Sequence, residues 1–250
     1  TWWGSRPTHL RSIQGAEPRL SPMEFHEWEP VYEQILADFG FERAADERAR
    51  DRLAALTEPF DVASLAGFEG ATVAVAGAGP PLADELAIAS AADRVVAAST
   101  AADVLADAGV TVDLVVTDLD KNPDSLAAMS HEGVPVAVHA HGDNVPAVEA
   151  WVPEFASEQL LPTTQAAPTG PVQNFGGFTD GDRAAFLADA LGAAELRFLG
   201  WAFDDPTVEP LKAKKLDWAE RLLYWLETRR GERFAVLDGR RAALSLPVER

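Results

Sequence analysis

The chain of 250 residues contains no cysteine. Disulfide bridges, thiolate nucleophiles and thiolate metal sites are therefore excluded. It also lacks any apolar run of about 18 residues, so we expect no membrane-spanning helix and no membrane partner. No stretch has the charged start, apolar middle and small-residue cleavage site of a signal peptide, and a cytoplasmic location is the default expectation.

Basic residues are scarce as well. The chain has 40 Asp and Glu against 21 Lys and Arg, a net charge of −19, and only four of the basic residues are lysine. A chain this acidic repels the phosphate backbone, so we expect no nucleic-acid partner. The acids are spread along a chain that is 47% hydrophobic, which is typical of a folded, salt-adapted protein rather than of a disordered acidic tail.

Three regions are predicted. Residues 1–22 contain three prolines and the pair Trp2-Trp3 without any periodicity, and we expect a poorly ordered extension. Residues 23–66 are expected to form N-terminal helices packed on the core, with helical patterns at Phe25–Phe39 and Glu42–Leu56 separated by Gly40. Residues 67–250 are expected to form one α/β domain.

Strand and helix patterns alternate from Thr72 onward. Strands are predicted at Thr72–Ala76, Arg94–Ala98, Val112–Thr117, Val134–His139, Gln159–Thr163, Glu195–Gly200 and Phe234–Leu237. Helices are predicted at Leu82–Ala91, Ala101–Ala108, Pro123–Ser130, Val145–Phe155, Asp182–Leu191 and Val208–Arg229. Strands separated by helices of about 10–15 residues predict a doubly wound, mostly parallel sheet with helices on both faces.

Two carboxylates end the most strongly apolar of these strands. Asp118 and Asp120 follow the β-branched run at positions i and i+2, which the strand period of two places on the same side. Open α/β sheets bind ligands beyond the carboxyl ends of their strands, and paired carboxylates there suit Mg²⁺ held against a phosphate. The alternative is a helix N-cap and a solvated loop acid before Asn122-Pro123.

A polar segment, His139–Asn144, follows the next strand. It resembles the H-x-H-x-D-H ligand motif of binuclear zinc hydrolases, but Asn144 replaces the last histidine and no histidine lies downstream, which argues against such a site. Asp143 and Asn144 are able to face the same cleft as the acid pair, which makes Asp143 a further candidate metal ligand. We interpret His139 as a hydrogen-bonded core residue.

Two glycine-containing loops are candidates for ligand binding. Gly77-Ala78-Gly79 follows a strand, but Leu82 stands at the next required glycine, so the motif predicts either a phosphate-binding turn or an ordinary tight turn, not a nicotinamide site. The functional interpretation of the loop at residues 174–183 is that Asp180 or Asp182 joins the cleft acids while Asn174 and the phenylalanines hold a planar ring. The alternative there is a capping box between Thr179 and Asp182.

Three of the four lysines lie together at residues 212–215. On a helical wheel Lys212 and Lys215 fall in the middle of the apolar face, whereas Lys214 lies outside it. Charges at that position face apolar groups and oppose the positive end of the helix dipole, and an anionic ligand would resolve both problems. Snorkelling of the lysines toward solvent is the alternative.

Cleft acids, a glycine turn and inward lysines together indicate metal-assisted phosphoryl or pyrophosphoryl transfer. The chain has neither a Walker A lysine motif nor a protein-kinase H-R-D set. Four segments, in this order and spacing, resemble the archaeal 6-hydroxymethyl-7,8-dihydropterin pyrophosphokinases over about residues 24–240: Thr117–Asp120, His139–Asn144, Asn174–Arg183 and Lys212–Leu216. The chain departs from the pattern at Lys121-Asn122, where a glycine is expected after the second acid.

The resemblance implies a fold related to the catalytic domain of thiamine pyrophosphokinase. It also implies Mg²⁺-dependent transfer of diphosphate from ATP to the pterin hydroxymethyl group, with release of AMP, in archaeal tetrahydrofolate or methanopterin synthesis. Asp118, Asp120 and Lys215 are then the expected catalytic residues. The expected nucleotide-binding residues are Gly77, Gly79, Asn174, Asp180, Asp182, Lys212 and Lys215.

Two other functions are considered. A thiamine pyrophosphokinase would use the same cleft for another acceptor, but its usual second, all-β domain has no room after Leu237. The other is a nucleotide-binding regulatory module without turnover. The sequence does not fix the oligomeric state, for which a homodimer is one option.

Overall fold

The computed structural model describes residues 22–248. The expected extension at residues 1–22 therefore lies outside the described residues except for Pro22. Six strands form one sheet in the order β5-β4-β3-β2-β1-β6, and every pairing is parallel. The strands are β1 (Thr72–Ala76), β2 (Arg94–Ala98), β3 (Leu114–Thr117), β4 (Val136–Ala140), β5 (Leu160–Thr164) and β6 (Glu195–Leu199). The predicted α/β fold is confirmed.

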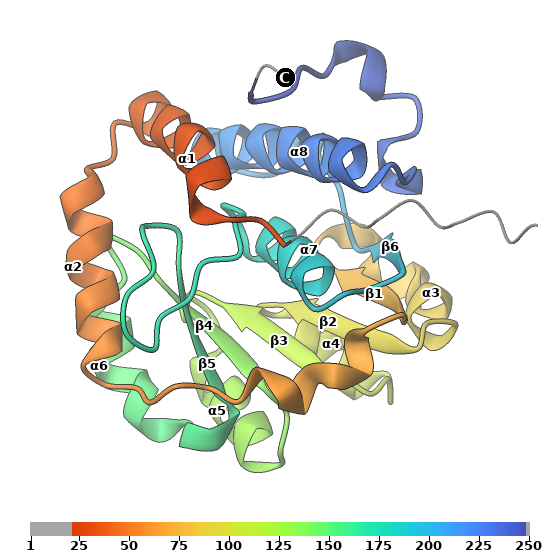
Figure 1. The fold of residues 1–250 in the computed structure, drawn as a ribbon. Helices are drawn as coiled ribbons and strands as arrows, with labels where there is room; N and C mark the ends of the chain where they lie inside the picture. The colour runs from red at the N-terminus through yellow and green to blue at the C-terminus, as the bar shows by residue number, and fades with distance from the viewer. Residues whose placement is uncertain (1–21, 249–250) are drawn as a thin grey trace, which may run out of the picture.

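Helices cover both faces of this sheet (Figure 1). One face carries α3 (Leu86–Ser90), α4 (Ala101–Asp107), α5 (Pro123–His131) and α6 (Val145–Trp151). The other face carries α7 (Asp180–Ala190), with α8 (Pro210–Arg230) and α1 (Phe25–Phe39) packed beyond it. In the part of the chain that the structure describes, no helix has the length and apolar character needed to cross a bilayer.

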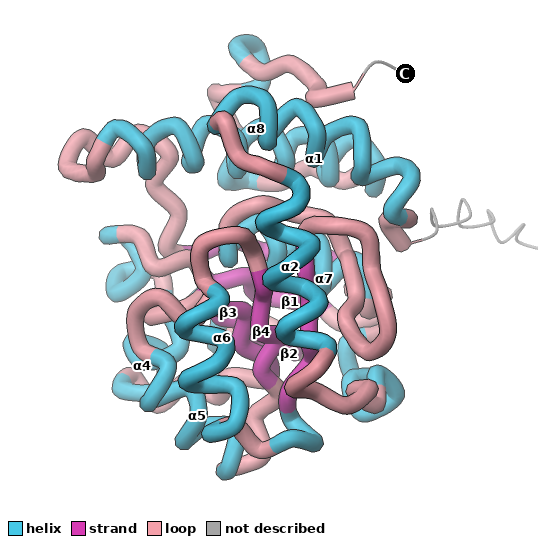
Figure 2. Tube along the Cα trace, turned by 90° about the vertical axis from the view of Figure 1, so that its left-hand side faces the viewer, coloured by secondary structure: helices cyan, strands magenta, loops and turns pink. Residues whose placement is uncertain are grey.

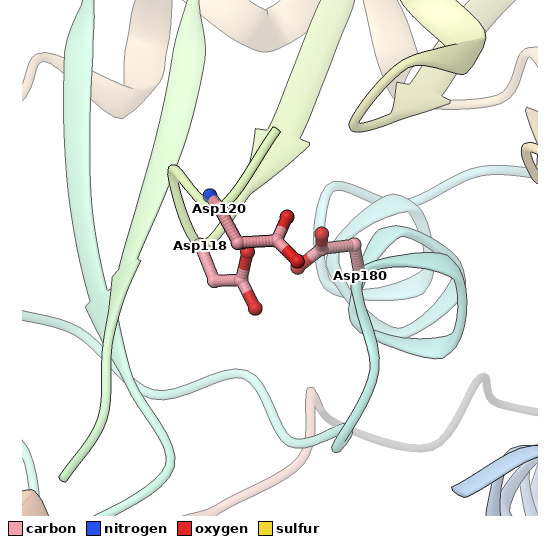
Figure 3. Close-up of side chains that lie close together, drawn as sticks. All are labelled: Asp118, Asp120 and Asp180. Carbon is pink, nitrogen blue, oxygen red and sulfur yellow. The ribbon is translucent and has the colours of Figure 1, made fainter. Parts of the chain in front are cut away.

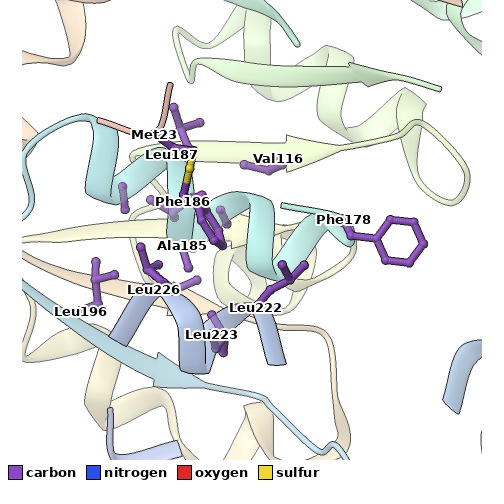
Figure 4. Close-up of a cluster of buried hydrophobic side chains, with 14 of the residues drawn as sticks. Met23, Val116, Phe178, Ala185, Phe186, Leu187, Leu196, Leu222, Leu223 and Leu226 are labelled. Carbon is purple, nitrogen blue, oxygen red and sulfur yellow. The ribbon is translucent and has the colours of Figure 1, made fainter. Parts of the chain in front are cut away.

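Alternation along the strands divides the core in two. Val73 and Val75 of β1 belong to the cluster under α7, whereas Ala74 and Ala76 belong to the cluster under α3 to α6. This is the period of two expected for a strand buried on both faces. Figure 4 shows the α7 side, where α7 and α8 pack against each other through Phe186 and neighbouring leucines.

The N-terminal helices reach both layers. Helix α1 ends at Gly40, whose φ of 69° allows the left-handed turn into α2 (Arg43–Ala54). Trp28 of α1 packs on Phe186 of α7, with ring centroids 6.4 Å apart. Helix α2 then runs beside α6 at the β4–β5 edge (Figure 2), where its Leu53 joins the opposite core cluster. The segment at residues 40–46 is thereby brought to the end of the sheet.

The predicted strand Phe234–Leu237 is wrong. Ala235–Leu237 is a short 3-10 helix, in which Phe234 and Leu237 are both buried. Their spacing of three residues places them on one side of a 3-10 turn, so the apolar run has a helical rather than a strand explanation. Glu227 holds the turn by accepting a hydrogen bond from the Phe234 amide at 2.6 Å.

Gly77 and Gly79 allow the turn after β1 to pass very close to the end of β6. Their amides donate to the carbonyls of Leu199 and Gly200 at 2.9 and 2.8 Å. A Cβ atom at either glycine would lie 2.7 Å from the Gly200 oxygen. This point, between the neighbouring strands β1 and β6, is where the order of the sheet reverses, which is the usual ligand crevice of a doubly wound fold. The tight-turn interpretation explains these glycines, whose amides are occupied by backbone carbonyls.

We predict that Gly77→Ala lowers the free energy of unfolding by about 1–3 kcal/mol, because the added methyl group meets rigid backbone. Gly67→Ala is a matched control, since its Cβ would meet only the end of the flexible Arg94 side chain, at 2.8 Å. Urea unfolding measures both variants. Equal losses in the two would contradict the role of the β1–β6 crossing.

Candidate active site

A cavity of about 650 Å³ opens beyond the carboxyl ends of the strands. The turns after β1 and β6 line one end, with Gly79 and Trp201 among the lining residues. The α1–α2 turn and the start of α2 line the other end, with Phe41 and Asp46. Acids from the β3 turn and from α7 lie in the same cavity, as do two lysines of α8.

Asp118, Asp120 and Asp180 form a cluster whose ligand oxygens all lie within 4.8 Å of one another (Figure 3). The strand period predicted the meeting of the first two, but the structure gives another reason. Strand β3 ends at Thr117, and Leu119 adopts a φ of 69° that turns the chain. The Leu119 amide donates to the Thr117 hydroxyl at 3.0 Å, and the leucine side chain is buried. The turn, not the pleat, aims both carboxylates at one point.

The three carboxyl groups have different electrostatics. Burial alone would raise the pKa of Asp118, but the His141 hydrogen bond and the Arg183 charge outweigh it, so this pKa is depressed. Burial and the negative charge of Asp118 raise the pKa of Asp120. The same two causes raise the pKa of Asp180 to about 7, against the opposing charge of Arg183. Lys121 also lies 3.5 Å from Asp120, yet the pKa values of Asp120 and Asp180 stay raised, so the nearby cations offset burial and repulsion only in part.

His141 lies between two acids of the predicted site. Its Nε2 is 3.3 Å from Asp118 and its Nδ1 is 2.6 Å from Asp143. Burial would lower the pKa of His141, but these two carboxylates raise it. Asp143 lines the cavity and bonds this histidine, and it lies outside the three-acid cluster that we predicted it would join.

His139 and Asn144 are buried residues whose hydrogen bonds hold the segments that carry the site. His139 is buried and its Nδ1 lies 3.1 Å from the Thr163 hydroxyl, as expected for a core histidine. The Asn144 side chain donates to the carbonyls of Asp118 and His139 and accepts from the His141 amide. Asn144 was predicted to be able to face the cleft. In the structure its side chain instead joins the turns after β3 and β4.

Two predicted nucleotide-binding residues lie away from the cavity lining. Asp182 is fully buried and forms the capping box of α7 with Thr179, the alternative that the sequence left open. Asn174 donates to the Ala166 carbonyl at 2.9 Å and accepts from the Gly176 amide, so it shapes the loop before α7. The capping box is what places Asp180, the first residue of α7, beside the acid pair.

The lysines separate as the wheel predicted. Lys212 and Lys215 line the cavity, but Lys212 is exposed and Lys215 is half-buried, so neither is enclosed by apolar groups as the wheel suggested. Lys214 instead pairs with Asp38 at 2.9 Å and lies over the Phe39 ring. Two of the three cations of this cluster are therefore available to a ligand in the cavity.

Two features escaped the sequence analysis. Ser99 directly follows β2 with a φ of 50°, lines the cavity, and has a buried hydroxyl without a partner among the described residues. Arg183 lies beside the acids and bonds both Asp180, at 3.1 Å, and Gln165, at 3.3 Å. Unusual backbone angles concentrate at functional sites, but the sequence does not show that Ser99 has one. Arg183, near the start of a helix, likewise carries no sequence signal of its contact with the acids.

Comparisons with known proteins identify the family of this chain. The family model described as 6-hydroxymethylpterin diphosphokinase MptE-like matches residues 48–207. A protein of Methanothermobacter thermautotrophicus named 6-hydroxymethyl-7,8-dihydropterin pyrophosphokinase is 37% identical over 224 residues, which cover 82% of this chain and 96% of the relative. The protein of that name from Pyrococcus furiosus is 38% identical over 223 residues, 82% of this chain and 95% of the relative.

A third protein with this name, from Methanocaldococcus jannaschii, is 29% identical over 232 residues, or 82% of this chain and 96% of its own length. The family match and these identities confirm the resemblance drawn from the four short segments. The chain belongs to the MptE-like 6-hydroxymethylpterin diphosphokinase family and is an enzyme of the pyrophosphokinase class.

Proposed function

We propose that this enzyme transfers diphosphate from ATP to the hydroxymethyl group of 6-hydroxymethyl-7,8-dihydropterin, with Mg²⁺ as the cofactor. The observation that carries the proposal is the meeting of three carboxylates and two cavity-facing lysines at the carboxyl end of the sheet. The names of the three archaeal relatives support the acceptor. We place the reaction in archaeal tetrahydrofolate or methanopterin synthesis, in the cytoplasm.

The acid cluster suits a hard divalent cation. Its donors are carboxylate oxygens only, which Mg²⁺ prefers, and burial together with the negative charge of Asp118 raises the pKa values of Asp120 and Asp180. Asp118, Asp120 and Asp180 would hold the ion, with Asp143 at the edge. Bound there, Mg²⁺ would supply charge neutralisation for the phosphate oxygens.

The residues of the chain then have distinct tasks. Lys212 and Lys215 bind the phosphate oxygens and balance their charge, while Ser99 offers a hydroxyl at the same edge of the sheet. The acceptor hydroxyl oxygen forms a bond to the β-phosphorus of ATP, the bond from that phosphorus to the α–β bridging oxygen breaks, and the hydroxyl proton is released. The products are AMP and the pterin diphosphate. Positioning and charge account for such a transfer without a covalent enzyme intermediate.

The direct test is the appearance of AMP from ATP in the presence of each acceptor. We expect AMP only when the hydroxymethyl-dihydropterin is added, and none with thiamine. AMP formation with thiamine alone would favour the thiamine pyrophosphokinase alternative. ATP binding without AMP formation with either acceptor would favour a nucleotide-binding module.

We predict that Asp118→Asn and Asp120→Asn each slow transfer by about 10²-fold or more at saturating Mg²⁺, because each removes a charge that the metal–phosphate complex needs. Asp143→Asn is the matched comparison, since Asp143 lies outside the cluster, and should lose less. Turnover measured over a range of Mg²⁺ concentrations checks the order. Wild-type rates in both Asn variants at positions 118 and 120 would refute the metal assignment.

A different response is predicted for Asp180→Asn in the metal-free enzyme. The folded pKa of about 7 lies above the ordinary 3.8, so the stabilisation from holding the proton is complete below about pH 4 and is lost as the pH rises through 7. An uncharged Asn avoids that loss. At pH 8 without metal, the free energy of unfolding of the variant should therefore exceed that of wild type by about 1 kcal/mol or more, which raises its melting temperature. The difference should be smaller at pH 5.

Thermal melting with and without Mg²⁺ checks this prediction. The same variant should lose most of the Mg²⁺-induced rise in melting temperature. An Asp180→Asn enzyme that is less stable than wild type at pH 8, yet keeps the full response to Mg²⁺, would contradict it.

We also predict that Lys212→Met and Lys215→Met reduce the melting shift that Mg-ATP induces, because each removes a charge that faces the phosphates. Lys214→Met is the matched control on the same helix. Its lysine pairs with Asp38 outside the cavity, so its loss should change stability by about half a kcal/mol and leave the ATP shift intact. If all three variants keep the full Mg-ATP-induced rise in melting temperature, the lysines extend into solvent and do not bind the phosphates.

A further inference from the structure

The two ends of the cavity are lined by different residues. The β1–β6 end has Ala78, Pro80, Trp201 and Val208 in its lining, together with the acid Asp205. The end formed by the α1–α2 turn contains Phe41, Asp46 and Gln165. The acid cluster follows β3, and β3 lies between these two edges in the strand order. If two substrates react at the acid cluster, each of them can therefore occupy one end of the cavity.

Asp46 is a buried carboxylate at the α2 end. It is 3% exposed and accepts hydrogen bonds from the Gly142 amide at 2.7 Å, the Tyr32 hydroxyl at 2.8 Å and the Gln165 amide at 2.8 Å. None of the ion pairs found within residues 22–248 includes it. A carboxylate has about four acceptor positions, so one remains for a donor from a ligand, and a buried anion without a cation favours such a donor.

Phe41 supplies an aromatic surface at the same end of the cavity as this carboxylate. It is 42% exposed, although it lines the cavity, and its ring stacks on Phe39 with centroids 5.3 Å apart and planes 20° apart. Phe39 in turn contacts Phe178 at 5.1 Å, which also lines the cavity. An exposed ring held in place by stacking is preorganised to take a further flat ring.

Gly142 fixes the position of Asp46 relative to the turn after β4. A Cβ atom there would lie 2.7 Å from the Ala45 side chain, so only glycine lets α2 come this close to the turn after β4. The same glycine donates its amide to Asp46. The turn that carries His141 and the helix that carries Asp46 are therefore held together, which keeps the α2 end of the cavity beside the acids.

We propose that the ring of the acceptor occupies the α2 end, flat against Phe41 and with its amino-pyrimidinone edge toward Asp46, and that ATP takes the β1–β6 end. The pterin identity of the ring rests on the proposed function. A pterin edge presents a ring N–H beside an exocyclic amino group, so each atom facing Asp46 is a donor and one of them can occupy its remaining acceptor position. Adenine presents a ring nitrogen acceptor beside its amino group, which a carboxylate repels. Phe41 and Asp46 also lie before residues 48–207, the segment that the family model matches.

Two variants test the proposal through separate binding measurements. Binding of 6-hydroxymethylpterin is followed by its fluorescence, and binding of Mg-ATP by the melting shift. Phe41→Leu should weaken pterin binding about tenfold, the usual effect of losing one ring from a stack, with ATP binding unchanged. Asp46→Asn should weaken it about 10–100-fold, because a charged acceptor becomes neutral.

Val104→Ala is the control, since Val104 is 39% exposed on α4 and lies outside the cavity lining. It should change neither affinity. Phe41 is exposed, so the Leu variant keeps the test valid even if Asp46→Asn weakens the fold. In steady state both variants should raise KM for the pterin and leave KM for ATP as in wild type.

The outcomes separate this proposal from the proposed function. Wild-type enzyme that forms AMP with the pterin, together with variants that lose ATP affinity instead, would overturn the placement alone. Unchanged pterin affinity in Phe41→Leu would overturn it as well. Wild-type enzyme that binds no pterin and forms no AMP would overturn both.

Discussion

Repulsion among three carboxylates is the constraint on which the rest of the site depends. Asp118, Asp120 and Asp180 place their oxygens within 4.8 Å of one another, which costs stability unless a proton or a cation reduces the charge. Nearby protein groups compensate only partly. Arg183 pairs with Asp180 at 3.1 Å, His141 lies 3.3 Å from Asp118, and the half-exposed Lys121 lies 3.5 Å from Asp120. A fold that maintains this cluster is one prepared for a divalent ion and the phosphates that accompany it.

Much of the surrounding structure serves to hold that cluster in place. The capping box of α7 positions Asp180, and the left-handed Leu119 turns the β3 loop. Beyond them, a buried chain of hydrogen bonds runs from Arg183 through Gln165 and Asp46 to Tyr32. This chain couples the acid cluster to α1 and α2, which explains why N-terminal helices outside the sheet contribute to the cavity.

Sequence patterns predicted the fold well because its signals are local. All six strands of the sheet and the helix Phe25–Phe39 followed from apolar periodicity and from glycine at the helix end. The error at Phe234–Leu237 arose because two apolar residues three apart also fit one 3-10 turn. The wheel correctly separated Lys214 from Lys212 and Lys215, since helix geometry alone decides it.

The site was less predictable because it depends on contacts between distant segments. The sequence indicated a capping box for Asp182 but left open which of Asp180 and Asp182 joins the cleft acids, and only the fold shows that it is Asp180. Asp143 was expected among the metal ligands but bonds His141, and Asn174 shapes a loop. Arg183 and Asp46 carried no local pattern at all. Their importance comes from burial beside partners far away in the chain.

Proton release on metal binding tests the central claim most directly. If Mg²⁺ relieves the repulsion in the cluster, binding must displace the proton that Asp180, with its pKa of about 7, carries below neutrality. Titration calorimetry with Mg²⁺ in buffers of different ionisation enthalpy counts the protons released. We predict release that is larger at pH 6.5 than at pH 8.5. Mg²⁺ binding without proton release at either pH would contradict the account.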